Sequence, residues 1–153
     1  MFCLFNLTDA CYSEVWQKDI PDEMYENIYK FITPDCDLVI NFGLSTWIYD
    51  NNLNLRYKYN DLRGLSLSAV SRDKLFYKTI KDNKNVIDIY SQDHHELLDT
   101  LTAPAGCTWD CILRVCVHPA TSQVIVLDCV NKAMHIFSNT GVSLMMIFST
   151  HLQ

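Results

Sequence analysis

Four cysteine and histidine residues near the C-terminal third of the chain could do chemistry together. The stretch "CTWDCILRVCVH" contains thiols and an imidazole that could hold a metal ion: Cys107, Cys111, Cys116 and His118. Their spacing differs from the CxxC pairs that usually anchor zinc. Thiols that pack as small apolar groups are the commoner use of such residues. We therefore predict no metal and no cofactor, and keep a metal site here as an alternative.

The stretch "QDHHELLD" is a second group with reactive side chains. Asp93, His94, His95 and Glu96 could bind a divalent cation or exchange protons near neutral pH. The same stretch has the polar composition of a solvated hairpin turn, which is the interpretation we adopt. The sequence has only 4 glycines and contains no nucleophile elbow, phosphate-binding glycine loop or HExxH motif. We predict that the protein is not an enzyme; a small metal- or thiol-dependent enzyme is the second alternative.

A third group, "LRYKYNDLRG", places basic side chains beside aromatic ones: Arg56, Tyr57, Lys58, Tyr59 and Arg63. Proteins bind single-stranded RNA with such residues, because bases stack on the rings while Arg and Lys contact the phosphates. On a strand, Tyr57 and Tyr59 would share one face and Arg56 and Lys58 the other. That arrangement equally describes an aromatic core face and a solvated basic face. RNA binding around these residues is therefore an alternative function.

Three tryptophans, Trp16, Trp47 and Trp109, could each anchor a protein partner. Each could instead pack in the core, which is the commoner use of this side chain. Of the three tryptophans, we keep Trp109 as a candidate partner contact, in addition to the five residues of the basic–aromatic group.

The composition indicates one packed domain inside the cell. The chain has 153 residues, of which 49% are hydrophobic and 20% charged. Its net charge of −6 disfavours a general affinity for nucleic acid. The 7 cysteines are scattered and odd in number, which favours reduced thiols and a cytoplasmic protein. No apolar run approaches the length of a membrane span, so we expect no membrane association.

The elements that must position these residues are short strands, and they recur. "LRGLSLSAV", "DKLFYK", "NVIDIYS" and "HELLDTL" alternate apolar and polar residues and are separated by turn signals. "LRVCVH", "VIVLD", "AMHIFS" and "VSLMMIF" repeat the same order. The repeat distance is 50 residues from Leu65 to Val115 and 47 from Leu97 to Leu144. A period of this size is typical of propeller blades and other repeat arrays.

A third copy is predicted upstream, in "NIYKFITPD", "DCDLVINF", "STWIYDN" and "LNLRYKY". Before it, "DIPDEMYENIYKF" has the spacing and capping residues of a short helix, although its part from Tyr29 to Phe31 is compatible with a strand. "YSEVWQ" is either an outer strand or an extension of that helix. We predict an N-terminal segment over 1–30 and repeats over 31–60, 61–104 and 105–153.

The repeat resembles a blade of the NHL-type β-propeller, a relative of the WD40 propeller. The positions that carry the resemblance are Val115 and Val117, Val126-Leu127-Asp128, Asn131, Ile136-Phe137 and Gly141. The second unit keeps this outline but has Lys78 in place of the Asp and His94-His95 in place of the Gly. The resemblance implies an all-β chain, a partial propeller of two to three four-stranded antiparallel blades, with a short helical or irregular N-terminal segment.

The resemblance also implies a role. NHL and WD40 relatives are often non-enzymatic scaffolds that serve ubiquitin ligases or post-transcriptional regulation. A partial propeller leaves strand edges and apolar sheet faces open to another chain. We therefore expect a protein-interaction module whose partner is another protein or a second copy of this chain. The cysteine patterns of RING and B-box domains are absent, so ligase activity is not expected from this chain alone.

Overall fold

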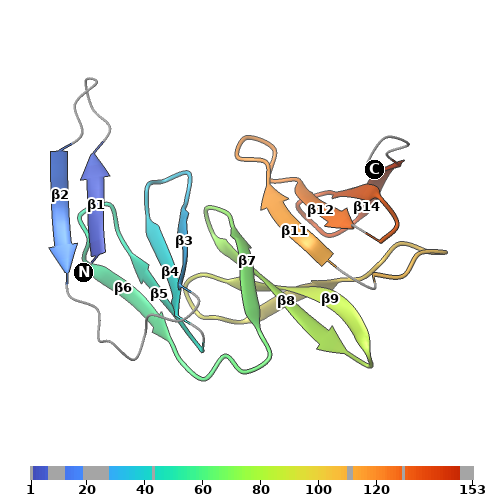
Figure 1. Ribbon diagram of the computed structural model, residues 1–153, viewed down its shortest axis with the longest axis horizontal. Helices are drawn as coiled ribbons and strands as arrows, with labels where there is room; N and C mark the ends of the chain where they lie inside the picture. The colour runs from blue at the N-terminus through green and yellow to red at the C-terminus, as the bar shows by residue number, and fades with distance from the viewer. Residues whose placement is uncertain are drawn as a thin grey trace.

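The computed structural model describes residues 2–6, 13–18, 28–42, 44–109, 112–128 and 130–148. Every regular element in these ranges is a β-strand, which confirms the expected all-β fold class. The strands form one two-stranded sheet and three four-stranded antiparallel sheets. The sheets follow one another along an arc, with β1 and β2 at one end and β11 to β14 at the other (Figure 1).

Each sheet is a simple meander, in which every strand pairs with its neighbour in the chain. The N-terminal sheet contains β1 (Phe2–Asn6) and β2 (Ser13–Lys18). The first four-stranded sheet, here called the first sheet, contains β3 (Ile28–Ile32), β4 (Leu38–Phe42), β5 (Ser45–Tyr49) and β6 (Leu55–Tyr59). The second sheet contains β7 (Ser66–Val70), β8 (Lys74–Lys81), β9 (Lys84–Ser91) and β10 (Leu97–Leu101). The third sheet contains β11 (Ile112–Val117), β12 (Val124–Asp128), β13 (Ala133–Phe137) and β14 (Ser143–Phe148).

Local sequence explains where the strands turn. The longest hairpin, β8–β9, turns at Asp82 and Asn83, whose φ angles are 51° and 59°. Two residues in the left-handed region form the kind of tight turn whose twist matches that of the strands on either side. Asp and Asn tolerate this region better than most residues. This turn therefore lies between "DKLFYK" and "NVIDIYS", where the sequence analysis expects one.

The opening strands of the three sheets lie side by side. Strand β7 contacts both β3 and β11, so the innermost strand of each sheet is the first in its chain order. Radial repetition of four-stranded meanders about a common axis is the arrangement of propeller blades. The third copy that the sequence predicts upstream is thus a complete four-stranded sheet.

Two hydrophobic cores fill the spaces between neighbouring sheets. Alternate residues of β8 enter different cores: Leu75 and Tyr77 pack toward the first sheet, and Phe76 packs toward the third. All three are at most 2% exposed. Because successive side chains of a strand point to opposite faces, this burial shows that the second sheet is covered on both faces.

The N-terminal predictions have a mixed outcome. Strand β3 pairs with β4 along its whole length, so the part of the predicted helix from Ile28 onward is wrong and the strand alternative is right. The apolar and aromatic side chains of "IYKFI" suit a pleated ladder once β4 lies beside it. The remainder of the predicted helix, 19–27, lies outside the described residues. The "YSEVWQ" segment is a strand, β2. Over the described ranges, no helix has the length and apolar character needed to cross a membrane.

Candidate functional site

The basic–aromatic stretch forms β6, the last strand of the first sheet, and its two kinds of side chain face opposite ways. The rings of Tyr57 and Tyr59 stack with centroids 6.3 Å apart and pack against the core between the first and second sheets. Arg56 and Lys58 are exposed on the other face. The alternation therefore has the geometry predicted from the sequence. The rings on which an RNA base would stack face the core instead of the solvent.

The basic side chains of this stretch have partners within the first sheet and the turn after it. Arg56 Nη1 lies 2.8 Å from Asp37 Oδ2, and this carboxylate raises the pKa of Arg56. Lys58 Nζ lies 4.6 Å from the ring centroid of Trp47, a cation–π distance. Arg63 Nε lies 2.6 Å from an oxygen of Asp61, and both side chains are exposed. The stretch thus presents a solvated, internally paired surface.

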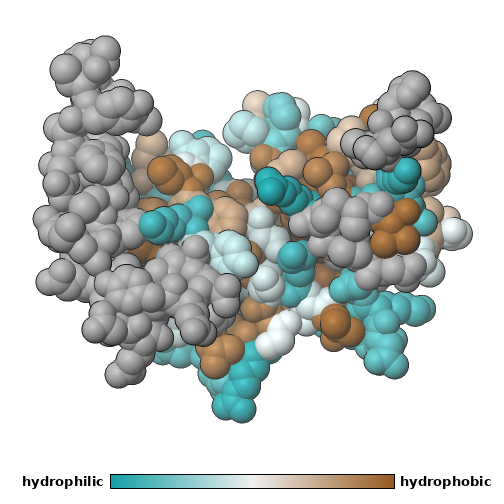
Figure 2. All heavy atoms as spheres, in the orientation of Figure 1, coloured by the Kyte–Doolittle hydropathy of each residue, from teal (hydrophilic) through white to brown (hydrophobic). Residues whose placement is uncertain are grey.

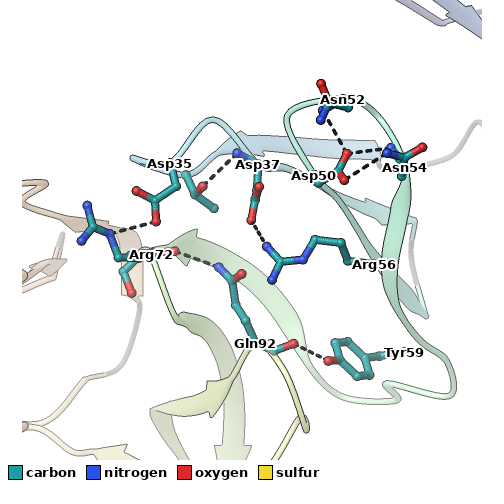
Figure 3. Close-up of polar contacts among 11 residues, drawn as sticks. Asp35, Asp37, Asp50, Asn52, Asn54, Arg56, Tyr59, Arg72 and Gln92 are labelled. Carbon is teal, nitrogen blue, oxygen red and sulfur yellow. Dashed lines mark hydrogen bonds and ion pairs between the residues drawn. The ribbon is translucent and has the colours of Figure 1, made fainter.

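A set of polar contacts joins the first sheet to the second, and we call it the inter-sheet latch (Figure 3). Tyr59 Oη lies within hydrogen-bond distance of the carbonyl oxygens of Gln92 and Asp93, the latter at 3.0 Å. Burial raises the pKa of Tyr59 to about 12, so its hydroxyl stays a donor. Arg72 Nε of the second sheet lies 2.9 Å from Asp35 Oδ2 of the first. These contacts fix how the two sheets are oriented.

Gln92 completes the latch from within the second sheet. Its side-chain Nε2 donates to the carbonyl oxygen of Ser71 at 2.8 Å, and its backbone N donates to the carbonyl oxygen of Asp73. The turn that receives Tyr59 is therefore tied to the turn that carries Arg72. In the first sheet, Asp50 accepts hydrogen bonds from Asn52 and Asn54 and shapes the neighbouring turn (Figure 3).

The two histidines of "QDHHELLD" have different environments. His94 is exposed and lies beside Asp93, as the solvated-turn interpretation predicts. His95 instead stacks between Tyr59 and Tyr90, with ring centroids 4.4 Å and 4.5 Å away. Burial lowers the pKa of His95, which favours a neutral ring. The stacking role of His95 could not be predicted from the sequence, because its partner Tyr59 comes from another sheet.

The cysteine–histidine cluster is dispersed among different contacts. Cys107 Sγ lies 3.6 Å from Met146 Sδ, and Cys116 is exposed on β11. His118 Nδ1 accepts a hydrogen bond from the backbone N of Thr121 at 3.2 Å, which shapes a turn. Cys111 lies outside the described residues. Among the residues that the structure describes, no three His, Cys, Asp or Glu side chains are grouped so that they could hold a metal ion.

Trp109 is a core residue in this structure, which corrects its selection as a partner contact. It is 3% exposed and contacts His135 and Phe137 with its ring, each at a centroid distance of 5.8 Å.

His135 is fully buried, and its Nε2 lies 3.6 Å from Asp128 Oδ2, beyond normal hydrogen-bond length. Burial alone would raise the pKa of Asp128. Hydrogen bonds donated by Asn131, together with the electrostatic effect of the nearby His135, outweigh burial and lower this pKa.

A hollow lies where the first turns of the three sheets meet. It has a volume of ≈ 720 Å³, and its polar lining includes Arg72, Asp73 and His118. Arg72 is paired with Asp35, and His118 Nδ1 accepts a hydrogen bond from the backbone N of Thr121 in the same turn. Within the described residues, these groups do not form a nucleophile with an adjacent base, nor an unpaired cation that could bind an anion.

The third sheet carries a feature that none of these motifs predicts, an apolar face opposite its core face. Only the inner part of this face, at Arg114, Cys116 and Leu127, borders a hollow shared with the first and second sheets. Strand register places two rows of side chains on this face: Cys116, Ile125, Ile136 and Met145, and Arg114, Leu127, Met134 and Ile147. We call it the outer face. Met145 is 54% exposed and Ile147 43%. Hydrophobic atoms are visible at the surface where β14 lies (Figure 2).

The edge of the same sheet adds to this surface. Strand β14 is the last in its sheet, and Val142, Leu144 and Phe148 are also exposed along it. Phe148 pairs with Ala133, so it lies on the opposite face from Met145 and Ile147. Single exposed apolar residues are ordinary, but a contiguous exposed apolar patch marks an interaction site in many soluble proteins. Of the surfaces described, the outer face with strand β14 is the one whose chemistry indicates a binding site.

Taken together, these features define an all-β chain of propeller-like blades, and comparison with known proteins supports that class. No protein-family model matches the sequence, and no curated protein matches it. The fold is similar to that of Hsv2 from Kluyvelomyces marxianus, with a TM-score of 0.58 and 12% identity over 79% of this chain and 39% of that one. It is also similar to a protein of unknown function from Bacteroides caccae, with a TM-score of 0.54 and 7% identity over 90% of this chain and 50% of that one.

These likenesses concern the fold alone, because the identities are low. The chain spans half or less of the length of the two similar structures.

Proposed function

We propose that this protein is a non-enzymatic protein-interaction module built from NHL-like propeller blades, and that it binds through the outer face of the third sheet and strand β14. The observation that carries the proposal is the exposure of Met145 and Ile147 on a face whose other side chains, apart from Cys116 and Arg114, are Ile, Leu and Met. Leaving such side chains in water costs about 1.5–3 kcal/mol each relative to burial, so a partner that covers them gains affinity.

Two recognition modes suit this surface. A partner strand can pair with the open edge of β14 through backbone hydrogen bonds, and a partner sheet or helix can pack on the outer face. The resemblance to NHL propellers supports a scaffold role in ubiquitin-ligase or post-transcriptional regulation.

Affinity capture with matched variants tests this function. The double variant Met145→Lys/Ile147→Lys places charges on the outer face, and Ile80→Lys changes a residue that is 68% exposed at the far end of β8. We expect proteins retained by the native chain and by Ile80→Lys to be lost from the double variant. Their retention should change little with salt, because the surface is apolar. Equal retention by all three chains would refute the proposed surface.

A direct binding assay with a single-stranded RNA oligonucleotide tests the alternative function, which is RNA binding. A protein that neutralises phosphates loses affinity steeply as salt rises. The proposed module has no such affinity, and Arg56→Glu should leave capture of protein partners unchanged. Salt-sensitive RNA binding that Arg56→Glu or Lys58→Glu abolishes would overturn the protein-interaction proposal.

A further inference from the structure

We propose that the hollow at the inner part of the outer face binds a small organic phosphate, a phosphate monoester whose organic part is aromatic or apolar. We call this hollow the basic hollow. Its volume is ≈ 630 Å³, which is within the usual range of pockets that hold small molecules. The inference goes beyond the protein-interaction function, because it rests on other side chains and does not depend on what covers β14.

The basic hollow is formed mainly by the first strands of the three four-stranded sheets. Strand β7 contacts both β3 and β11, and the three strands follow one another along the arc in Figure 1. The lining includes Tyr29 and Phe31 from β3, Ser66 and Ser68 from β7, and Arg114 and Cys116 from β11. A ligand bound here therefore contacts all three sheets.

Two cations line the basic hollow, Lys78 of β8 and Arg114 of β11. Among the residues that the structure describes, neither side chain has an ion pair, a hydrogen bond or a ring contact, whereas Arg56, Arg63 and Arg72 are each paired with an Asp. The described lining includes no carboxylate. Like charges that share a hollow repel each other, and a bound anion offsets that repulsion.

The position of Lys78 follows from the strand pattern and departs from the sequence repeat. Lys78 comes two residues after Phe76, so both side chains belong to the face of the second sheet that is turned to the third. Where the third repeat has Asp128, the second has Lys78. Asp128 is 2% exposed and accepts a hydrogen bond from Asn131, whereas Lys78 is half-buried at the hollow. The second sheet thus presents a cation at a position where the third sheet buries a paired acid.

Charge and the available donors favour a phosphate monoester over other anions. A phosphate monoester carries a charge of about −1.5 to −2 at pH 7, which matches two cations, whereas a carboxylate or a phosphodiester carries a single charge. Ser66 is the register partner of Lys78, so its hydroxyl lies beside that side chain on the same face of the sheet. Hydroxyl, ammonium and guanidinium groups are the usual donors to phosphate oxygens.

The first sheet supplies a wall for the organic part of the ligand. Tyr29 is 48% exposed and Phe31 is partly buried, and both line the basic hollow. An aromatic or alkyl group that covers these rings removes apolar surface from water. A nucleic-acid strand needs more phosphate contacts than two cations provide, and the net charge of −6 opposes it. A small ligand therefore fits the hollow better than a polyanion.

Calorimetric titration of the full chain with phenyl phosphate measures this binding. We expect saturable binding that Lys78→Gln or Arg114→Gln weakens by about tenfold or more, because each substitution removes one charge-assisted contact. Lys132→Gln and Arg63→Gln, at exposed positions outside the hollow, are the matched controls and should bind as the native chain does. A native chain without saturable binding, or equal affinity in Lys78→Gln and Arg114→Gln, would overturn the site.

Further titrations show which part of the ligand is recognised. Inorganic phosphate should bind more weakly than phenyl phosphate, and equal affinity would overturn the aromatic part of the proposal. A single-stranded RNA oligonucleotide that displaces phenyl phosphate would assign the two cations to nucleic acid and overturn the small ligand. The Met145→Lys/Ile147→Lys variant should still bind phenyl phosphate, so failure of this site and failure of the protein-interaction function are measured separately.

Alkylation of Cys116 locates the ligand on the chain. Its thiol is exposed and lines the basic hollow, whereas Cys36, also exposed, lies outside it. Phenyl phosphate should slow the reaction of Cys116 with iodoacetamide in proportion to occupancy and leave that of Cys36 unchanged, as mass spectrometry of the peptides measures. Phenyl phosphate binding without protection of Cys116 would place the ligand elsewhere and overturn the proposal.

Discussion

Tyr59 shows how a single hydroxyl connects two sheets. Its ring belongs to the core beside Tyr57, while its Oη reaches the carbonyl oxygens of Gln92 and Asp93 in the second sheet. One side chain therefore contributes both apolar packing and the polar contact that orients its neighbour. The contact with Gln92 is part-buried, so its carbonyl loses a hydrogen-bond donor that water replaces only in part.

Replacing Tyr59 with Phe keeps the ring and removes only this contact. We expect the free energy of unfolding to fall by about 1 kcal/mol, the usual net value of a hydrogen bond between uncharged groups. Urea denaturation followed by circular dichroism measures the change. Tyr29→Phe, at an exposed position, is the control and should alter stability little. Equal stability of native and Tyr59→Phe chains would contradict the latch.

His95 makes stability depend on pH. Because burial lowers its pKa in the folded state below the usual value, the unfolded chain binds the proton more readily. The contribution of His95 is complete above the pKa of the unfolded chain, about 6.5, and is lost as pH falls from there through the lower, folded-state pKa. His95→Phe keeps a stacking ring without a titrating group.

Denaturation midpoints at about pH 7.5 and about pH 5.5 test this linkage. We expect the native chain to lose more stability between the two than His95→Phe does, because the native imidazole must take up a proton between its partner rings. His94→Phe, at the exposed neighbour, should keep the full pH dependence. The same loss in native and His95→Phe chains would show that His95 is not the sensitive group.

At the scale of the element, the turn between β13 and β14 joins the third sheet to the second. Gly141 has φ of 78°, and a Cβ at this position would meet the Asp99 carboxylate and the Leu101 side chain of β10. Two features require a glycine at this position: the positive φ angle, and the close approach of the Asp99 and Leu101 side chains. Lys74 adds a second link, because its Nζ lies 3.0 Å from the carbonyl oxygen of Asn139 in the same turn.

Gly141→Ala should therefore destabilise the protein more than a glycine change that brings backbone strain alone. Gly106 provides that control, since its φ is 82° and no atom lies within 4 Å of an added Cβ. We expect Gly106→Ala to cost about 1 kcal/mol and Gly141→Ala clearly more. Thermal unfolding measures both. Adding Asp99→Ala to Gly141→Ala should recover part of the loss; no recovery would mean that the contact is not the cause.

The strands could be predicted from the sequence because alternation and turn residues act locally. The strands of the second and third sheets lie where apolar alternation and the intervening turn signals indicate. Residues 28–32 were ambiguous because the spacing of Ile20, Met24 and Ile28 also suits a helix; pairing with β4 decides for the strand. Local pattern carries no information about which partner strand will be available.

The candidate site could not be predicted in the same way, because exposure depends on what lies beyond the sheet. "VIVLD" and "AMHIF" have apolar residues on both faces, and sequence alone would bury both. The structure buries one face of these two strands and leaves the other half-buried. Trp109 shows the opposite outcome, because the sequence leaves a partner contact open for this residue, whereas packing beside His135 and Phe137 buries it.

For the whole molecule, the second sheet is the element on which both cores depend. Leu75 and Tyr77 enter one core and Phe76 the other, from three consecutive positions of β8. Loss of that strand would expose both cores at once. The three sheets should therefore unfold together, although each is locally paired.

Tryptophan fluorescence can test this coupling, because Trp47 lies in the first sheet and Trp109 beside the third. Phe76→Ala leaves a cavity in the second core and should lower the free energy of unfolding by about 3–5 kcal/mol. Two forms of this variant keep a single probe: Trp16→Phe/Trp109→Phe keeps Trp47, and Trp16→Phe/Trp47→Phe keeps Trp109. In each form we expect fluorescence and circular dichroism to give the same midpoint. Separate midpoints would show that the first sheet stays folded after the third has unfolded.

The meander topology also determines the order in which the protein can be made. No strand of a four-stranded sheet pairs with a strand from another sheet, so each sheet is complete as soon as its own four strands have been synthesised. Ribosomes add about 5–20 residues per second, whereas a hairpin forms in about 1–10 μs. The first sheet can thus be fully paired before the second has left the ribosome. The nascent chain then grows blade by blade, and each new sheet finds a finished surface on which to pack.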